Sequence, residues 1–288
     1  MAQSVGTSKD SVSIASNATA ADGLTLLRIV PHWLRVFGSR LSEIVIVVDS
    51  EPLEGRIAEL QRGQSNPEKL QEAIRTLEAS DQRVRFVSLG SINPTAIQRR
   101  WFGKARPVRC QAGTPILAFV AAIEQARCDI VLRCDSDMLF CERGWLLEDA
   151  LPSLQEGVDV YEPPRLHLDA KTVVSSRAFM VAKHSFYGRL PLRNLRLDML
   201  RRLQRMISGR PPWLALEQMI ASSVAKGQLS YKVGRNTDLG FSLHGLKRSY
   251  FASPWFGDVV HSIEAGQVPG QQRRYLDFNP DHWGVQVL

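Results

Sequence analysis

The stretch Asp129-Ile-Val-Leu-Arg-Cys-Asp135-Ser136-Asp137-Met-Leu-Phe140 decides the fold, because an apolar run typical of a strand ends there in two carboxylates. Side chains at positions i and i+2 of a strand point to the same face, so we expect Asp135 and Asp137 to reach one ion together. Carboxylate oxygens are the ligands that Mg²⁺ and Mn²⁺ take, usually beside substrate phosphates and water. Solvated turns also favour aspartate, so the residues around this pair must decide between the two interpretations.

The residues before this strand predict a helix. Thr114 stands at the expected N-cap and Pro115 at the first helical position, directly after Gly113. The apolar residues that follow keep helical spacing, at Ile116, Phe119, Val120 and Ile123. A helix followed by a strand is the repeating unit of open α/β sheets, in which ligands collect outside the carboxyl ends of the strands. This context favours a metal site at Asp135 and Asp137 over a solvated turn.

Strands and helices alternate along the first half of the chain. The expected strands cover residues 11–15, 43–49 and 83–89, and the second of them is a continuous β-branched run typical of a buried parallel strand. We expect one helix to begin at Asp22 and another at Asn66, and Pro31 should kink the first or end it early. Their apolar positions are Leu24, Leu27, Val30, Leu34 and Phe37 in the first helix, and Leu70, Ala73, Ile74 and Leu77 in the second. The alternation predicts a mostly parallel sheet.

The second half of the chain does not continue the regular alternation of strands and helices. Short strands are expected at residues 159–161, 172–174 and 178–181, a basic amphipathic helix at 197–207, and another helix from Pro211. We expect both halves to share one sheet. Residues 1–10 are polar and are expected to be a flexible N-terminus, which leaves residues 11–288 as a single domain.

Composition limits the class of protein. The 288 residues are 44% hydrophobic and 23% charged, which is ordinary for a globular protein, and the net charge of +7 favours anionic partners. No apolar run is long enough to cross a bilayer, and the N-terminus lacks the pattern of a signal peptide, so a cytoplasmic location is expected. The four cysteines do not follow zinc-finger spacing and are expected to be reduced, mostly buried thiols.

With Asp49 at a strand end, the helix from Gly113 and the Asp135-Ser136-Asp137 turn, the chain resembles the GT-A class of nucleotide-sugar glycosyltransferases, most closely the bacterial family 2 type. The resemblance covers residues 11–140 well and the remainder loosely. It implies a Rossmann-like α/β/α sandwich with a mostly parallel central sheet. Residues 11–140 would bind the nucleotide-sugar donor, and residues 141–288, with a C-terminal tail, would bind the acceptor.

The resemblance also implies a donor site. Asp135 and Asp137 match the family's Asp-x-Asp motif, which would hold Mn²⁺ or Mg²⁺ against the donor phosphates, with Ser136 between them beside the donor. Asp49 matches the acid that binds the nucleobase, where it would accept a hydrogen bond from the N3–H of uracil, and a strand-ending turn residue is its other interpretation. The remaining candidates are Arg106 and Arg109 for phosphate or ribose, and His244, ahead of His261 and His282, as a late metal ligand. A structural histidine is the alternative for His244.

Glu217 is the candidate general base. It lies on one predicted helix face with Trp213, Ile220 and Val224, so it points inward, and a buried carboxylate is paired, shifted in pKa or facing a polar cleft. An acidic residue in this region serves as general base in the inverting members of the resembling family. A structural ion pair is the alternative. Gln218 follows Glu217 where the family has a Glu-Asp pair, and that departure puts the role in doubt.

Seven arginines crowd residues 189–210, interleaved with leucines. They are compatible with a helix on an anionic membrane, with binding of nucleic-acid phosphates, or with a solvated face over a core stripe. Leucines at helical spacing favour the last interpretation, and the lack of interleaved aromatic residues argues against nucleic acid.

Together these features predict a metal-dependent glycosyltransferase that moves a sugar from a nucleotide donor, with UDP-sugar preferred, to a small-molecule, peptide or glycan acceptor. Inversion at the anomeric carbon is expected only if Glu217 is the base. One rival is a sugar-1-phosphate nucleotidyltransferase, which needs a Gly-rich loop after the first strand that residues 16–21 do not supply. Another rival is a non-catalytic basic module that binds membrane or nucleic acid through residues 189–210.

Overall fold

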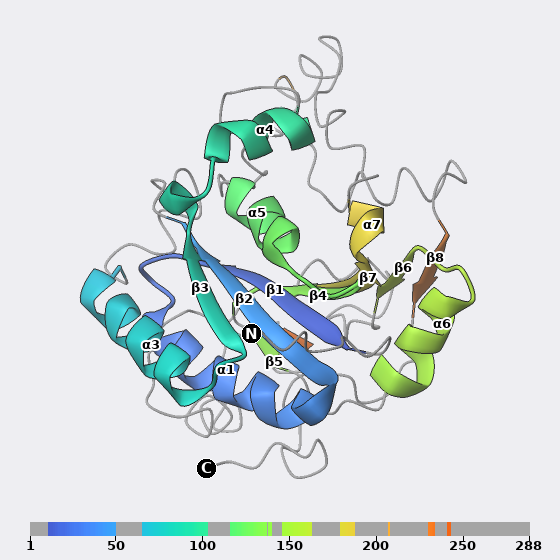
Figure 1. Ribbon diagram of the computed structural model, residues 1–288, viewed down its shortest axis with the longest axis horizontal. Helices are drawn as coiled ribbons and strands as arrows, with labels where there is room; N and C mark the ends of the chain where they lie inside the picture. The colour runs from blue at the N-terminus through green and yellow to red at the C-terminus, as the bar shows by residue number, and fades with distance from the viewer. Residues whose placement is uncertain are drawn as a thin grey trace, which may run out of the picture.

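The central sheet begins with four parallel strands. The computed structural model describes residues 11–49, 65–102, 116–136, 138–139, 146–162, 179–187, 207, 230–233 and 241–242. In this part of the chain a seven-stranded sheet has the order β3-β2-β1-β4-β7-β6-β8 (Figure 1). The parallel strands are β1 (Val12–Ala18), β2 (Leu41–Val48), β3 (Val84–Ser88) and β4 (Ile130–Cys134).

The strands from the second half of the chain extend the same sheet, as predicted. β7 (Phe179–Lys183) pairs antiparallel with β4 and with β6 (Val160–Glu162), and β6 pairs parallel with β8 (Tyr231–Val233). A separate antiparallel pair joins β5 (Met138–Leu139) to β9 (Phe241–Ser242). The predicted strand at 172–174 and the helix from Pro211 lie outside the described residues, as do residues 197–207 apart from Ile207.

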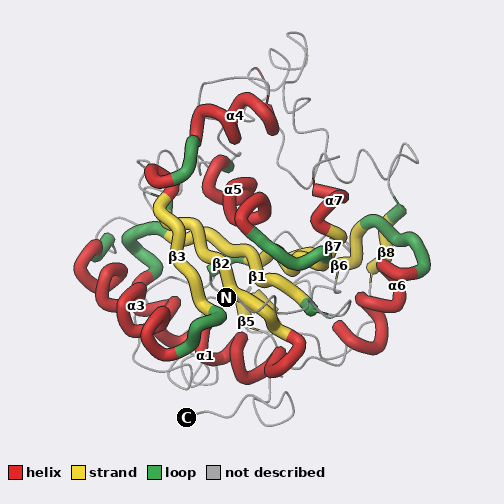
Figure 2. Tube along the Cα trace, viewed as in Figure 1, coloured by secondary structure: helices red, strands yellow, loops and turns green. Residues whose placement is uncertain are grey.

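Helices cover both faces of the sheet (Figure 2). One face carries α1 (Gly23–Phe37), α3 (Pro67–Ser80), the short π-helix η3 (Leu146–Ala150) and α6 (Leu151–Gln155). The other face carries α4 (Pro94–Phe102), α5 (Leu117–Gln125) and α7 (His184–Tyr187). Two 3-10 turns, η1 (Gly38–Arg40) and η2 (Leu89–Ser91), complete the described helices. The predicted fold class, an α/β/α sandwich with a mostly parallel central sheet, is confirmed.

The β-branched run of β2 explains why the sheet is buried on both faces. Ile44 and Ile46 pack into the core on the side of α1 and α3, whereas Val45 and Val47 pack on the side of α5. A central parallel strand alternates its side chains between two covered faces, so it reads as continuously apolar. Two hydrophobic cores, one per face, therefore hold the carboxyl ends of the parallel strands in fixed positions.

The first helix does not end early at Pro31, which was one of the two effects predicted for this proline. α1 continues through Pro31 to Phe37 and is neither ended nor shortened there. Pro31 is exposed, so the helix can adjust on its solvent side while Trp33 and Phe37 anchor its second half in the core. The large apolar residues that are buried are Leu26, Ile29, Val30, Trp33 and Phe37, whereas the predicted Leu24, Leu27 and Leu34 are only partly buried.

Other helix and strand ends are partly as predicted. Asn66 caps α3, because its side chain accepts a hydrogen bond of 2.9 Å from the backbone N–H of Lys69. β1 runs to Ala18, beyond the predicted end at Ala15. α5 begins at Leu117 with Ile116 at the N-cap position, later than predicted from Thr114 and Pro115, which lie outside the described residues.

Two further sequence predictions concern cysteines and membrane helices. Cys128 and Cys134 are free and buried, as predicted, and Cys110 and Cys141 lie outside the described residues. Among the helices of the described ranges, none combines the length and the apolar composition that a membrane crossing requires.

Candidate functional site

Three neighbouring parallel strands, β2, β1 and β4, bring polar residues to one edge of the sheet. Asp49 directly follows β2, Asn17 lies near the end of β1, and Asp135 directly follows β4. The backbone N–H of Asp49 donates to the carbonyl of Ala18 across 2.8 Å, which joins the ends of β2 and β1. Because parallel strands end at a common edge, residues far apart in the sequence meet there, where ligands of open α/β sheets bind.

The buried carboxylate of Asp22 organises the loop after β1. One of its oxygens accepts hydrogen bonds from the backbone N–H and the hydroxyl of Thr19, at 2.7 and 2.8 Å. Its other oxygen accepts a hydrogen bond of 3.1 Å from the hydroxyl of Ser136. Asp22 stands at the N-cap position of α1, as predicted, but makes no side-chain cap bond to that helix. Its carboxylate instead connects the loop after β1 to the turn after β4.

Arg133 is a buried cation inside β4. Its guanidinium donates through one Nη to Asp135 Oδ1 and through the other Nη to Asn17 Oδ1, the latter at 3.1 Å. The guanidinium carbon lies 3.9 Å from the centre of the Phe119 ring, close enough for a cation–π interaction. Arg133 therefore connects β4 to β1 and to α5, and it fixes one oxygen of Asp135.

Asp135 offers a partly exposed carboxylate, which is a group that divalent ions bind. Its side chain is 30% exposed, whereas that of its partner Arg133 is only 5% exposed. Hard cations such as Mn²⁺ and Mg²⁺ prefer carboxylate oxygens, and they commonly use one or two carboxylates together with substrate phosphates. Within the described ranges no three metal-binding side chains come together. The partners predicted for Asp135, namely Asp137 and His244, lie outside those ranges.

The predicted site residues divide into two groups. Asp49, Asp135 and Ser136 lie at the carboxyl edge of the sheet, where Asp49 is 5% exposed and Ser136 is 7% exposed. The hydroxyl of Ser136 donates to Asp22, and its contact with a donor stays a prediction. The other five predicted residues lie outside the described part of the chain: Arg106, Arg109, Asp137, Glu217 and His244.

Sequence reasoning missed Asn17 and Arg133, and it saw Asp22 only as a helix cap. Arg133 gave a signal that could have been used, since it is the one charged residue in the run Ile130–Cys134 and stands two positions before Asp135, on the same strand face. The contacts of Asp22 and Asn17 gave no such signal, because their partners on β4 and in the turn after it are more than a hundred positions away.

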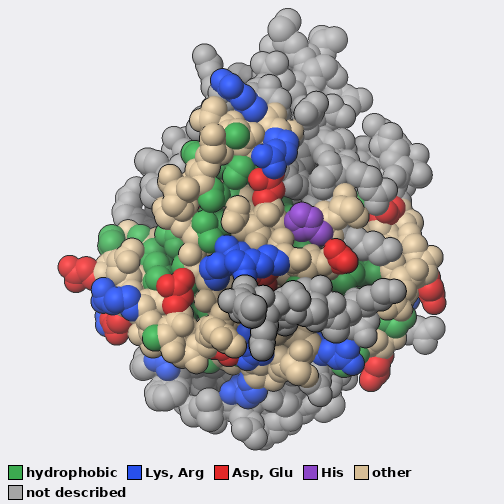
Figure 3. Space-filling view, viewed as in Figure 1, with side chains coloured by type: hydrophobic (Ala, Val, Ile, Leu, Met, Phe, Trp, Pro, Cys, Tyr) green, Lys and Arg blue, Asp and Glu red, His purple; other side chains and the backbone are tan. Residues whose placement is uncertain are grey.

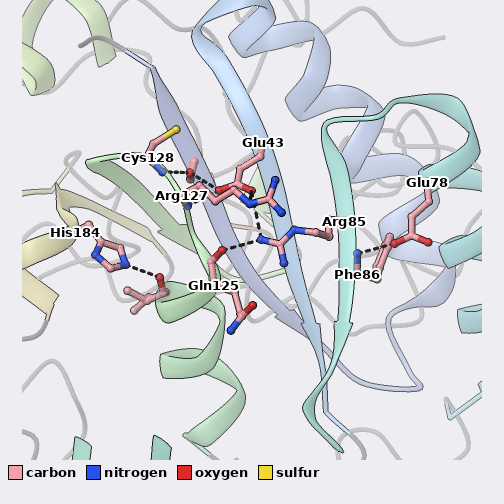
Figure 4. A network of polar contacts seen from close by, with 10 residues as sticks. Glu43, Glu78, Arg85, Phe86, Gln125, Arg127, Cys128 and His184 are labelled. Carbon is pink, nitrogen blue, oxygen red and sulfur yellow. Dashed lines mark hydrogen bonds and ion pairs between the residues drawn. The ribbon is translucent and has the colours of Figure 1, made fainter. Parts of the chain in front are cut away.

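A second polar network lies at the other end of the parallel strands, where β1, β2 and β3 begin (Figure 4). There Glu43 accepts hydrogen bonds from Ser13 at 2.8 Å, from the backbone N–H of Arg127, and from Arg85 at 3.3 Å. Cys128 N–H in turn donates to the Ser13 hydroxyl at 3.0 Å. Both Glu43 oxygens are engaged by protein groups, so this network joins the amino ends of β1, β2 and β3 to the chain before β4 and serves the fold.

Several basic side chains of the described surface are held in ion pairs. In the space-filling view, blue and red side chains lie side by side at several places (Figure 3). Arg100 pairs with Glu124 at 2.9 Å between α4 and α5, and Arg83 pairs with Asp81 at 2.7 Å. The arginine-rich segment 189–210 lies outside the described residues apart from Ile207, so its three interpretations stay open.

Comparison with known proteins gives similarity of fold only. The sequence matches no protein family and no curated protein. A structure of an LgtC active-site mutant is 13% identical and has a TM-score of 0.48, over 96% of this chain and 100% of that one. The mannosyltransferase PcManGT from Pyrobaculum calidifontis, in complex with GDP-Man and Mn²⁺, is 12% identical with a TM-score of 0.47, over 97% and 73%.

A synthase is also structurally similar to this chain. The 4-diphosphocytidyl-2C-methyl-D-erythritol synthase from Anaerococcus prevotii is 9% identical with a TM-score of 0.45, over 90% of this chain and 100% of that one. Similarities this distant assign neither an activity nor a residue role to the chain.

Proposed function

We propose that the protein is a glycosyltransferase that uses a nucleotide-sugar donor and a divalent metal ion. The observation that carries the proposal is the convergence of Asp49, Asn17 and Asp135 on the shared carboxyl edge of β2, β1 and β4. The hydrogen bonds from Arg133 to Asp135 and Asn17, and from Ser136 to Asp22, hold these strand ends together. The carboxylate of Asp135 is thereby preorganised. Preorganised acidic groups at this edge suit a ligand that brings phosphates and a metal ion together.

In the proposed reaction, Asp135 and Asp137 would hold the metal ion and, through it, the diphosphate of the donor. A bound Mn²⁺ or Mg²⁺ would neutralise the charge that develops on the departing nucleoside diphosphate. Ser136 holds the turn between the two carboxylates through its bond to Asp22. Arg133 holds Asp135 from inside the sheet. Asp135 and Asp137 would therefore bind the donor, and Ser136 and Arg133 would position them.

Asp49 is proposed to bind the nucleobase. It follows β2 directly, and its backbone N–H is bonded to the end of β1, next to the loop that Asp22 organises. A carboxylate there accepts a hydrogen bond from the N3–H of uracil, which makes UDP the first probe to use. Arg106 and Arg109 are proposed to contact phosphate or ribose.

The second half of the chain is proposed to bind the acceptor, a small molecule, peptide or glycan. Glu217 is proposed as the general base that takes the proton of the acceptor hydroxyl. As that proton leaves, the acceptor oxygen bonds to the anomeric carbon and the bond from that carbon to the diphosphate breaks. This displacement would invert the configuration, and His244 is proposed to complete the metal site.

A change in melting temperature on ligand binding tests the proposal, with two aspartate variants as a matched pair. Both Asp135 and Asp81 stand two positions from an arginine that binds them, but Asp81 lies between α3 and β3. We expect UDP with Mn²⁺ at saturating concentration to raise the melting temperature of the wild type by about 5 °C or more. Asp135→Asn should abolish the rise and Asp81→Asn should keep it.

Two results would decide against the proposal. If neither UDP nor GDP raises the melting temperature with any divalent metal, the donor assignment is wrong. If pyrophosphate appears when the protein is given a nucleoside triphosphate and a sugar 1-phosphate, the protein is a nucleotidyltransferase. The loop Thr19-Ala-Ala-Asp22 after β1 contains no glycine, which argues against that second reaction.

A further inference from the structure

Arg133 is an unexpected residue for its place in the fold. β4 is the strand that leads to the proposed metal site, and the other four residues of this strand are apolar and at most 7% exposed. A charge in such a place is costly unless bonded partners compensate it. The residues that bond to Arg133 therefore indicate the role of its buried charge.

Those partners belong to the proposed donor site. Asp135 and Asn17 accept from the two Nη atoms, and Phe119 lies against the guanidinium from α5. The buried Nε–H has no acceptor in the described part of the chain, a cost that the contacts of the Nη atoms and of the Phe119 ring must offset. The guanidinium is therefore oriented so that its two Nη atoms reach Asp135 and Asn17, although its Nε–H then has no acceptor among the described residues.

The burial of Arg133 argues against a direct contact with phosphate. Its side chain is 5% exposed and both of its Nη atoms are engaged by protein oxygens. It is therefore a positioning residue that acts through Asp135. Its unit positive charge lies next to the carboxylate that is proposed to bind a dication, and it holds Oδ1 of that carboxylate.

We propose that Arg133 makes metal binding at Asp135 depend on the nucleotide diphosphate. The inference rests on the proposed function. A guanidinium bonded to Asp135 offsets the charge of this carboxylate and repels a second cation, so the protein alone should bind a divalent ion weakly. A diphosphate brings the additional negative charge that the ion needs. Metal and nucleotide should then bind as a coupled pair, each strengthening the other by the same factor.

The coupling is measured in the wild type first. Mn²⁺ binding is followed by electron paramagnetic resonance, which reports free Mn²⁺, in the absence and presence of UDP. We expect UDP to tighten Mn²⁺ binding by about 100-fold. Equal Mn²⁺ affinity with and without UDP, in a protein that binds both, would overturn the inference but leave the proposed function standing. No binding of UDP with Mn²⁺ would instead overturn the proposed function.

Variants of Arg133 then separate charge from structure. Arg133→Met removes the charge, so nucleotide-free Mn²⁺ binding should become about tenfold tighter and the coupling correspondingly smaller. Arg133→Lys keeps the positive charge but lacks the second Nη group, which bonds to Asn17 in the wild type. The Mn²⁺ affinity of this variant without nucleotide should therefore stay within about threefold of the wild type. A purely structural role predicts the opposite for Arg133→Met, namely weaker Mn²⁺ binding because Asp135 is no longer held.

Arg85→Met is the matched control. Arg85 also pairs with a buried carboxylate, that of Glu43, and it also has an Nε without an acceptor among the described residues, but it lies at the other end of the parallel strands. Mn²⁺ affinity should be unchanged in this variant. If Arg133→Met does not fold, Arg133→Gln replaces it with a neutral side chain that still donates a hydrogen bond. Unchanged or weaker nucleotide-free Mn²⁺ binding in the folded neutral variant would contradict the inference.

Discussion

The hydroxyl of Ser136 donates a hydrogen bond of 3.1 Å to Asp22, a residue 114 positions earlier in the chain. Both residues are buried, at 7% and 4% exposure. The bond joins the turn after β4, which carries Asp135, to the loop after β1. The two loops that would meet a donor are thus held together by one carboxylate.

Removal of the Ser136 hydroxyl should affect both stability and ligand binding. Ser136→Ala deletes a hydrogen bond to a charged group, so the free energy of unfolding should fall by about 1.5 to 3 kcal/mol. UDP affinity in the presence of Mn²⁺ should fall by about tenfold, because the turn is less well positioned. Denaturant unfolding and calorimetry measure the two quantities.

Ser80→Ala is the control for that variant. The Ser80 hydroxyl donates to the Leu77 carbonyl at 2.8 Å, at the end of α3. Its removal should cost about 1 kcal/mol and leave UDP affinity unchanged. Equal UDP affinities for Ser136→Ala and Ser80→Ala would show that the link to Asp22 does not position the site.

Gly23, the first residue of α1, allows α1 and α3 to cross closely. A Cβ at this position would lie 2.6 Å from the backbone nitrogen of Leu70 and 2.7 Å from the carbonyl carbon of Lys69, and neither backbone atom can move aside cheaply. Gly23→Ala should therefore destabilise the protein by about 2 kcal/mol or more. At Gly90 the nearest atom to an added methyl would be the Ser88 hydroxyl oxygen at 3.7 Å, so Gly90→Ala should be nearly neutral in the same unfolding measurement.

The pair of Asp81 and Arg83 makes stability depend on acid pH. The side-chain hydrogen bond from Arg83 lowers the pKa of Asp81, against a smaller opposing effect of burial. A lowered folded-state pKa means that the stabilisation is present above the unfolded-state pKa and is lost as pH falls through the folded-state value. Asp81→Asn should cost less than about 1 kcal/mol at neutral pH, because the pair is partly exposed.

The stability gap between wild type and Asp81→Asn should close as pH falls below about 4. Urea unfolding of both proteins across this range measures the gap. A gap that stays constant down to acid pH would show that the charge of Asp81 is not the cause.

Tyr161 should affect alkaline stability in the opposite direction. Burial, and then the 2.8 Å hydrogen bond that its hydroxyl donates to Asp149, raise the pKa of Tyr161. A raised pKa means that the stabilisation is complete below the unfolded-state value of about 10 and is lost as pH rises above it. Tyr161→Phe should cost about 1.5 to 3 kcal/mol at neutral pH.

The stability difference between wild type and Tyr161→Phe should shrink above about pH 10, since only the wild type releases this proton on unfolding. Unfolding at neutral and alkaline pH measures the difference. A difference that grows with alkaline pH would contradict the assigned direction of the pKa shift.

The parallel half of the fold could be predicted because its signals are local. The β-branched run of β2 indicated a strand covered on both faces, and Asn66 before Pro67 indicated the start of α3. The strand-ending positions of Asp49 and Asp135 placed both residues at one edge, because parallel strands share it. The early end predicted at Pro31 was wrong, since an exposed proline is tolerated where the helix is anchored by buried residues on both sides.

The bonding inside the site could not be predicted because it depends on which strands are neighbours. Asn17 meets Arg133 only because β1 and β4 pair directly, and Asp22 meets Ser136 for the same reason. Periodicity and capping describe one element at a time and give no such pairings. The charge of Arg133 inside an apolar strand was the available signal, and it should have indicated a buried ion pair with the carboxylate two positions later.

A crystal structure of the protein with Mn²⁺ and UDP would locate both ligands relative to Asp135 and Asp49. We expect an anomalous Mn²⁺ peak within coordination distance of an Asp135 carboxylate oxygen, with the diphosphate of UDP on the same ion and the uracil ring beside Asp49. Mn²⁺ and UDP bound elsewhere, with Asp135 several ångströms from any phosphate, would contradict this expectation.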